Sequence, residues 1–288
     1  MNALLLDTSS LFFRAHHALP PMNTSTGEPT AALYGFSVLL LKLLRELRPD
    51  GVAFARDLPA PTFRHAEYTE YKAGRPPVPD ALRTQWRRLD ELIAAFGAPT
   101  HAVAGFEADD VLATLARRLT ERDADASVTI VSGDRDIFQL TTLRVRAHFV
   151  GARGQKPETL DAAAVEARYG VPPKSLPALF ALVGEAADNL IGVAGVGMKT
   201  ASKLVARYQT TNELIAHLDG VTPIKLRESL AAAADRVVMN ERLARLRDDL
   251  ALSDPLVGVI TPENRAAVKS VFAELEFKSL VARIDALS

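Results

Sequence analysis

The sequence has 288 residues, 48% of them hydrophobic, which provides enough apolar material for a sizeable core and excludes a disordered chain. It contains no cysteine, which excludes disulfide scaffolds and cysteine-ligated metal sites, and it has no apolar run long enough for a membrane span. The net charge is −1, but residues 107–136 carry eight acidic and four basic side chains, whereas residues 199–247 carry five acidic and nine basic ones. We expect a cytoplasmic protein with an acidic centre and a separate basic surface. Alternatively, the uneven charge reflects only two solvent-exposed helical faces of different composition.

Short apolar runs alternate with helical periodicity over the first half of the chain. The expected strands are residues 3–7, 51–55, 100–103, 127–134 and 144–150. The expected helices are residues 31–47, 81–96 and 105–119. This alternation predicts an α/β core over residues 1–155, with a mixed, mostly parallel sheet flanked by helices.

The second half of the chain is almost wholly helical in pattern. Its runs include "LDAAAVEARYGVPP", "SLPALFALVG", "MKTASKLVARY" and a long stretch over residues 223–249. No long linker separates these runs from the sheet, so we expect residues 156–288 to form a helical subdomain packed on the core.

Acidic side chains stand at the ends of expected strands and at the start of one helix. They are Asp7; Glu107, Asp109 and Asp110; Asp134 and Asp136; and Glu185 and Asp188. Each group alone has a plain structural explanation, such as a strand exit, a turn or compensation of the helix dipole. Ligands collect at the carboxyl ends of parallel strands, and carboxylates without cysteine or paired histidine suit Mg²⁺ or Mn²⁺. Together the groups predict a two-metal site of the kind that cleaves phosphodiesters.

The helix that begins near Gly105 holds three of these carboxylates in its first turn. Helical spacing puts Glu107 and Asp110 on one face, while Asp109 is expected to point aside. We therefore expect Glu107 and Asp110 to approach the metal and regard Asp109 as the least certain ligand.

A glycine-rich turn precedes the helix that begins near Met198. Glycines permit close backbone approach, and a helix start offers free N–H groups to phosphate oxygens. This arrangement predicts a helix–hairpin–helix motif that grips DNA phosphates, whereas the alternative is an ordinary turn with solvated lysines. The candidate DNA-binding residues here are Gly192, Gly195, Gly197, Lys199, Thr200 and Lys203.

Several motifs together resemble one known family. They are "LLLDTSSLFFRAHHALP", "PTFRHAEYTEYKAGRPPVPDAL", "GFEADDVLATLA", "VSGDRDIFQL" and "GEAADNLIGVAGVGMKTASKLV". In order, from about Leu4 to about Leu250, they are similar to the bacterial 5′–3′ exonuclease/flap endonuclease family. That family includes the N-terminal nuclease domain of bacterial DNA polymerase I and stand-alone small exonucleases. Because no polymerase region follows, the sequence looks like a stand-alone relative.

The resemblance implies a role for each matching residue. The first metal would be held by Asp7, Glu107, Asp109, Asp110 and Asp134, and the second by Asp134, Asp136 and Asp188. The scissile phosphate and the 5′ end would be engaged by Lys72, Arg75 and Arg14. Single-stranded DNA would pass an arch that contains Arg64, Tyr68 and Tyr71. The glycine turn would bind duplex phosphates together with a K⁺ ion.

The sequence departs from the family pattern in three places. Glu185 stands where the family has an aspartate, and it is one methylene longer. The family acid that follows the second strand is displaced to Asp57, which we interpret as an insertion. The segment over residues 58–79 is short and rich in proline, so a full helical arch is doubtful.

The function we expect is metal-dependent 5′–3′ exonuclease or flap endonuclease activity. We expect its partner to be branched, nicked or 5′-flapped DNA. An RNA primer paired with DNA is a further candidate substrate. We expect no interaction with a membrane. One alternative is a structure-specific DNA-binding relative whose second metal site is weakened at Glu185 and Ala187. The other is a ribonuclease of the wider carboxylate-nuclease class, against which the duplex-gripping glycine turn argues.

Overall fold

The computed structural model describes residues 1–151 and 155–286. Its main sheet has the order β3-β2-β1-β4-β5-β6, with every described pair parallel except the antiparallel pair of β5 with β6. The strands are β1 (Asn2–Asp7), β2 (Gly51–Ala55), β3 (Thr100–His101), β4 (Ser127–Ser132), β5 (Val145–Phe149) and β6 (Glu158–Leu160). The predicted mixed, mostly parallel sheet is confirmed.

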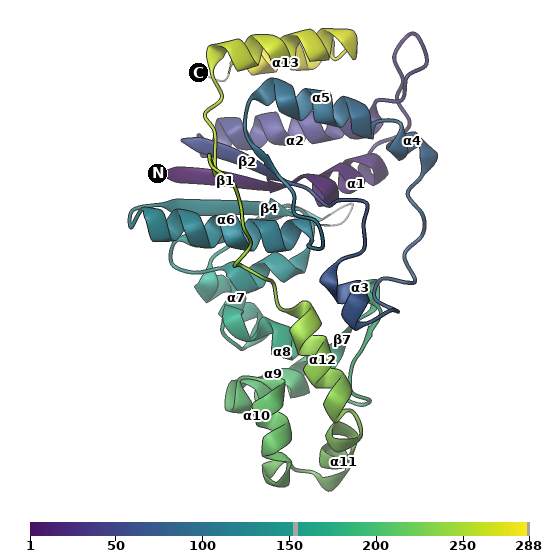
Figure 1. Ribbon diagram of the computed structural model, residues 1–288, viewed down its shortest axis with the longest axis vertical. Coiled ribbons are helices and arrows are strands. Elements are labelled where there is room, and N and C mark those ends of the chain that lie inside the picture. Colours follow the sequence, from purple (N-terminus) through teal and green to yellow (C-terminus); the bar gives the residue numbers. More distant parts are fainter. Residues whose placement is uncertain (152–154, 287–288) are drawn as a thin grey trace.

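Both faces of this sheet are covered, which explains why its central strands are continuous apolar runs. Along β1, Leu4 and Leu6 face one hydrophobic cluster, whereas Ala3 and Leu5 face the other. In Figure 1, α2, α5 and α13 lie on one side of the sheet and α6 on the other. The core helices are α1 (Thr8–Ala18), α2 (Ala31–Leu47), α3 (Phe63–Glu67), α4 (Asp80–Arg83), α5 (Trp86–Phe96), α6 (Ala108–Arg122), α13 (Pro262–Glu274) and α14 (Lys278–Asp285).

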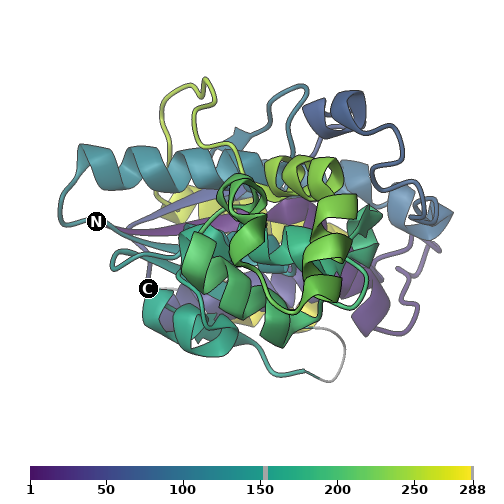
Figure 2. The same cartoon turned by 90° about the horizontal axis from the view of Figure 1, so that it is seen from below.

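The helical subdomain extends away from the sheet beyond α6, and Figure 2 shows its green helices in front of the sheet. Its helices are α7 (Ala162–Tyr169), α8 (Leu176–Val183), α9 (Met198–Tyr208), α10 (Thr211–Ala216), α11 (Ile224–Ala232) and α12 (Ala234–Ala244). A small ribbon of β7 (Gly184–Glu185) and β8 (Leu190–Ile191) follows α8. Short 3₁₀ turns are η1 (Arg135–Leu140), η2 (Pro173–Ser175), η3 (Ala186–Asp188) and η4 (Leu218–Gly220). None of the described helices is long and apolar enough to cross a membrane.

Two expected helices are each divided in the structure. The helix expected over residues 81–96 is interrupted before α5, where the buried side chain of Gln85 accepts hydrogen bonds from the backbone N–H groups of Ala32 and Leu33. The side chain thereby satisfies free donors at the start of α2. The run expected over residues 223–249 is divided into α11 and α12.

The chain returns to the core after the helical subdomain, so packing does not follow the boundary expected at residue 155. β6 joins the main sheet, and α13 and α14 bury Phe272 and Leu280 in the cluster beneath α2 and α5. The return segment, residues 245–261, runs along α6. It is held by Arg118, whose guanidinium donates to the Leu252 carbonyl, and by a backbone bridge between Gly258 and Val52.

Candidate active site

The acidic site begins where β1 ends. Asp7 is the last residue of β1 and the N-cap of α1, and its side chain is almost fully buried. Its Oδ1 accepts from the Ser10 backbone N–H at 2.9 Å, and its Oδ2 accepts from the Ser132 hydroxyl at 2.6 Å. Ser132, the last residue of β4, is a supporting residue that sequence reasoning missed, although its hydroxyl directly precedes the recognised "GDRD" turn.

Three further carboxylates follow the two strands that neighbour β1. Asp57 follows β2, and Asp134 and Asp136 follow β4. Asp134 caps η1, where its Oδ1 accepts from the Asp136 backbone N–H at 3.1 Å. Asp57 follows β2, and its Oδ1 accepts from the Ala108 backbone N–H at the start of α6, at 2.8 Å. Burial, and after it the charge of the nearby Asp57, raises the pKa of the Asp7 carboxyl. This proximity supports the interpretation that an insertion displaced the acid along the chain.

Asp109 faces these carboxylates from the first turn of α6. Burial, followed by the charges of Asp7, Asp134, Asp136 and Asp57, raises the pKa of Asp109 well above its usual range. Burial and the charge of Asp134 do the same to the pKa of Asp136. The Oδ1 atom of Asp109 is buried and has no hydrogen-bond partner. An unpaired buried carboxylate oxygen among like charges is costly, and either protonation or a bound cation relieves that cost.

The expectation that Asp109 points aside while Asp110 approaches the cluster is therefore wrong. Asp110 is fully buried, and its two oxygens accept from both terminal nitrogens of Arg64, at 2.7 and 2.8 Å. They also accept from the backbone N–H groups of Glu107 and Arg247, at 3.1 and 2.9 Å. Four donors from the protein thus satisfy the Asp110 carboxylate.

Glu107 and Asp188 are the carboxylates that border a basic segment. Lys72 Nζ lies 2.7 Å from Glu107, and Arg75 Nη2 lies 2.8 Å from Asp188. The Tyr71 hydroxyl donates to both carboxylates, at 3.3 and 3.0 Å. Burial alone would lower the pKa of Lys72, but the charges of Glu107 and Asp188 outweigh it and raise that pKa. The segment therefore places two cations, Lys72 and Arg75, and one hydroxyl, that of Tyr71, beside the carboxylates.

Two residues that the resemblance assigned to DNA are instead buried. Arg64 is 1% exposed and Tyr71 is 3% exposed, and both side chains are engaged inside the protein. The Tyr68 side chain is partly exposed, and its hydroxyl donates to the Asn189 carbonyl. Helix α3, whose N-terminus is closed by a capping box, spans only five residues, so no full helical arch forms.

Two other predicted residues lie at the margin of the site. Glu185, the glutamate that replaces an aspartate, pairs with Arg135 at 2.8 Å. Arg14 lies beside Asp134, with its Nε buried and without a hydrogen-bond partner. A Cβ at Gly133 would stand 2.3 Å from the Arg14 side chain, so that glycine makes room for the arginine.

The glycine turn follows β8 and leads into α9. A Cβ at Gly192 would stand 2.3 Å from the Val183 carbonyl oxygen, so Gly192 permits close backbone packing. Gly195 has φ +79°, and a Cβ at Gly195 or Gly197 would meet nothing within 4 Å. No side chain caps the start of α9. The candidate side chains of α9 are the exposed Lys199 and Lys203 and the partly exposed Thr200.

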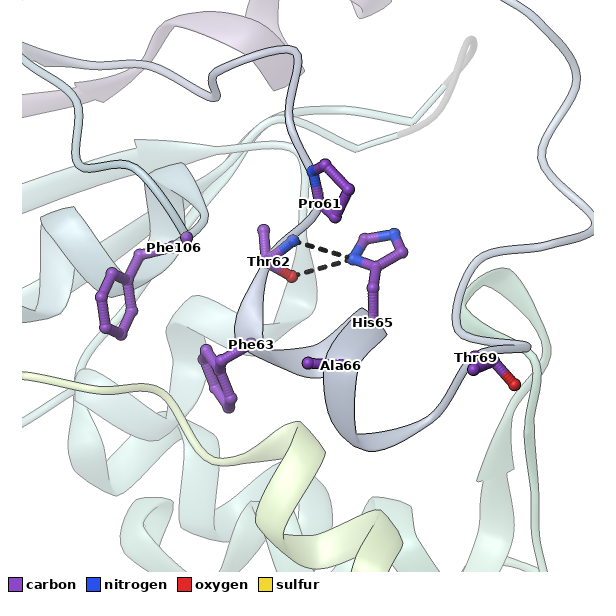
Figure 3. Close-up of a pocket in the computed structure, with 8 residues that line it drawn as sticks. Pro61, Thr62, Phe63, His65, Ala66, Thr69 and Phe106 are labelled. Carbon is purple, nitrogen blue, oxygen red and sulfur yellow. Dashed lines mark hydrogen bonds between the residues drawn. The ribbon is translucent and has the colours of Figure 1, made fainter.

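An open hollow of about 620 Å³ lies on the outer flank of α3. Figure 3 shows Phe63 and Phe106 on its wall, with their ring centroids 5.6 Å apart. His65 also lines it, and its Nδ1 contacts the backbone N–H and the hydroxyl of Thr62. Phe106 directly precedes Glu107 in the sequence, but none of the described acidic side chains lines the hollow.

The donor set suits a hard divalent cation, because it consists of carboxylate oxygens and includes the unpaired Asp109 oxygen. Across residues 1–151 and 155–286, no three acidic or histidine side chains already have the geometry to hold an ion. Glu107 and Asp188 are engaged by Lys72 and Arg75, whose charges partly balance theirs. The carboxylate oxygens are thus the right kind of ligand for a divalent metal ion. Some of these side chains would have to move for several of them to reach one ion.

Comparisons with known proteins identify the class to which this fold belongs. Residues 2–170 match the model of the N-terminal resolvase-like domain of 5′–3′ exonucleases, and residues 171–265 match the model of their C-terminal SAM fold. The fold is therefore that of a nuclease with a resolvase-like core and a helical second domain. The chain belongs to the 5′–3′ exonuclease family, whose members are enzymes.

The chain is similar to longer curated proteins and to solved nucleases. It is 36% identical over 287 residues to DNA polymerase I of Caldicellulosiruptor bescii and 38% identical over 280 residues to that of Thermus thermophilus. These matches cover 99% and 97% of the chain but 33% of each relative, so the chain spans about a third of their length.

Two solved structures share the fold at low sequence identity. The zinc-bound T5 5′-exonuclease has a TM-score of 0.67 at 19% identity, covering 100% of this chain and 98% of that one. The catalytic core of Rad2 in complex with DNA has a TM-score of 0.65 at 16% identity, covering 99% and 92%.

Proposed function

We propose that this chain is a divalent-metal-dependent 5′–3′ exonuclease and flap endonuclease, which hydrolyses phosphodiesters at 5′ ends, nicks or flaps of DNA. The observation that carries the proposal is the buried, unpartnered Oδ1 of Asp109, which faces the other strand-end carboxylates. Membership of the 5′–3′ exonuclease family supports it. The solved relatives that bind metal ions or DNA are consistent with it.

The carboxylates divide into two groups around the site. One group would hold the first ion: Asp7, Asp57, Glu107, Asp109 and Asp134. The second group would hold another ion with Asp134: Asp136 and Asp188. When bound, Mg²⁺ or Mn²⁺ would supply an activated water and stabilise the leaving oxygen. Glu185 contributes less in our proposal, because it pairs with Arg135.

Lys72 and Arg75 would attract and orient the phosphate that is cleaved. Lys72 is a compact point charge, whereas Arg75 offers a planar fork that matches two phosphate oxygens. The Arg75 side chain is 49% exposed, so substrate can reach it. Both cations already border Glu107 and Asp188, and an incoming phosphate would therefore meet positive charge immediately beside the carboxylates.

The helical subdomain would hold the duplex away from the site of cleavage. The uncapped start of α9 and the open backbone at Gly195 and Gly197 would accept phosphate oxygens, with Lys199 and Lys203 adding charge. Such contacts are independent of base sequence, which suits an enzyme that recognises the shape of a junction.

The test is cleavage of a 5′-flapped duplex in Mn²⁺ by the wild type and by Asp109→Asn. We expect the substitution to reduce kcat by about 10³-fold or more, since it removes a charge that would hold the metal, while flap affinity stays within about threefold. Asn264, on α13, provides a distant control in the form of Asn264→Asp. Equal turnover by wild type and Asp109→Asn, with intact flap binding, would favour a DNA-binding protein without nuclease activity. Equal cleavage of unstructured RNA and flapped DNA would favour the ribonuclease alternative.

A further inference from the structure

We infer that Arg64 and Asp110 form a buried positioning pair, which fixes Glu107 relative to the helical subdomain and contacts neither DNA nor metal. The inference rests on the proposed nuclease function, because positioning has meaning only for a site that acts. It gives these two residues a role different from the DNA-binding and metal-binding roles that the motif resemblance implies.

The pair joins three segments that are far apart in the sequence. Arg64 belongs to α3, Asp110 to α6, and their bidentate contact is fully buried. Arg64 Nε also donates to the Leu243 carbonyl at 2.8 Å, in the last turn of α12, and its Nη2 to the Arg245 carbonyl at 3.4 Å. A single guanidinium therefore connects α3, the first turn of α6 and the end of α12.

The Asp110 side of the pair determines where Glu107 lies. Asp110 Oδ2 accepts from the Glu107 backbone N–H and so completes the capping box of α6. The Glu107 side chain in turn contacts Lys72 at 2.7 Å and the Tyr71 hydroxyl at 3.3 Å. A shift of Asp110 would therefore move one proposed metal ligand and one proposed phosphate-binding cation together.

Helix α12, whose C-terminal end contacts Arg64, also contacts the residues at the start of the glycine turn. Near its start, Arg236 donates to the Ile191 and Gly192 carbonyls, at 3.1 and 3.2 Å. Asn240, one turn further along, donates to the Ile191 carbonyl at 3.0 Å. The 11 residues of α12 span about 16 Å, and a helix of that length behaves as a rigid rod. The rod thus links the proposed duplex-binding turn at one end with the Arg64–Asp110 pair at the other.

The first arm of the test is Arg64→Lys, which keeps the charge but loses the planar fork and the Nε donor. Flap cleavage should show kcat reduced about 10- to 100-fold, because misplacement of a reacting group by about 1 Å costs on that order, with KM within about threefold. Arg242→Lys is the matched control, since Arg242 pairs with Glu67 between the same two helices but at the surface. It should change kcat less than about twofold.

A second variant distinguishes loss of positioning from loss of folding. Arg64→Met with Asp110→Asn removes both buried charges together, and such replacements are often tolerated. A cooperative melt together with a kcat reduced as in Arg64→Lys supports the positioning role. Wild-type kcat in a folded variant of either kind overturns it. A rise in KM that accounts for the whole loss of kcat/KM would also overturn it, because Arg64 would then act on DNA binding.

A third arm does not depend on catalysis. Calorimetric titration with Mn²⁺ should show a larger loss of affinity in Asp109→Asn, which removes a ligand, than in Asp110→Asn, which only displaces Glu107 and should cost about tenfold. Equal losses in the two variants would make Asp110 a metal ligand and overturn the inference. If the wild type cleaves no DNA at all, the proposed function fails, and this arm still decides the role of Asp110.

Discussion

The stability of the metal-free protein should fall as the pH rises from 5.5 to 8. Burial, with the charge of Asp57, raises the pKa of Asp7 to about 7, against 3.8 for a free aspartate. Between these two values the folded protein binds a proton that the unfolded chain has already released. Folding is therefore favoured at low pH, and this contribution is lost as the pH passes 7.

The size of this effect follows from the shift of the Asp7 pKa. Only about half of this shift of about three pH units lies above pH 5.5, so the loss between pH 5.5 and 8 is about 2 kcal/mol, on the order of 5 °C in melting temperature for a chain of this size. Asp109 and Asp136 act in the same direction, because burial also raises their pKa values. The histidines His101 and His148 act oppositely, since burial lowers their pKa values and disfavours folding below about pH 6.5.

The assay is thermal unfolding in EDTA at several pH values for the wild type and Asp7→Asn. Asparagine has about the same shape and no charge, so the difference between the two proteins removes the contribution of the histidines. We expect Asp7→Asn to gain stability relative to wild type as the pH rises, and Mn²⁺ to raise the wild-type melting temperature most at pH 8. A difference between the two proteins that is constant from pH 5.5 to 8 would refute the assigned shift.

Three further predictions concern single side chains. Ser132→Ala should lower the free energy of unfolding, measured in urea, by about 1–3 kcal/mol at pH 8 and by less at pH 6. The reason is that the lost hydroxyl donates a hydrogen bond to the ionised form of Asp7. Gly192→Ala should lower the urea midpoint, since its Cβ would stand 2.3 Å from the Val183 carbonyl oxygen; an unchanged midpoint would contradict that packing. Lys203→Gln should weaken flap binding and reduce the slope of log affinity against log salt by about one, measured by fluorescence anisotropy. An unchanged slope would remove Lys203 from the DNA interface.

Most strands of the main sheet and the strand-end carboxylates were predictable because their signals are local, whereas β6 (Glu158–Leu160) was not expected. Asp7 and Asp134 each follow an apolar run, and parallel strands bring their carboxyl ends to one edge. The glycine turn was predictable for the same reason, since Gly195 needs a positive φ that few other residues adopt.

The roles inside the first turn of α6 were not predictable from spacing. Helical periodicity correctly groups Glu107 with Asp110, but it cannot say which face of the helix meets the strand ends. That choice depends on how α6 docks, and here Arg64, 46 residues earlier, occupies the face that holds Asp110. Arg64 looked like a solvent-exposed DNA contact because nothing local to it indicates burial. The return of α13 to the core was missed because its partners, α2 and α5, lie more than 160 residues away in the sequence.

That return has a consequence for synthesis of the chain. The apolar face of α2 and α5 is covered by Phe272, Leu280 and Ile284, which leave the ribosome roughly 180 residues after the end of α5. At about 5–20 residues per second, the face stays uncovered for roughly 9 to 35 seconds after α5 has emerged, while the helical subdomain can already fold. The order of assembly thus differs from the chain order: the helical subdomain can close before the core beneath α2 and α5 is completed by α13 and α14.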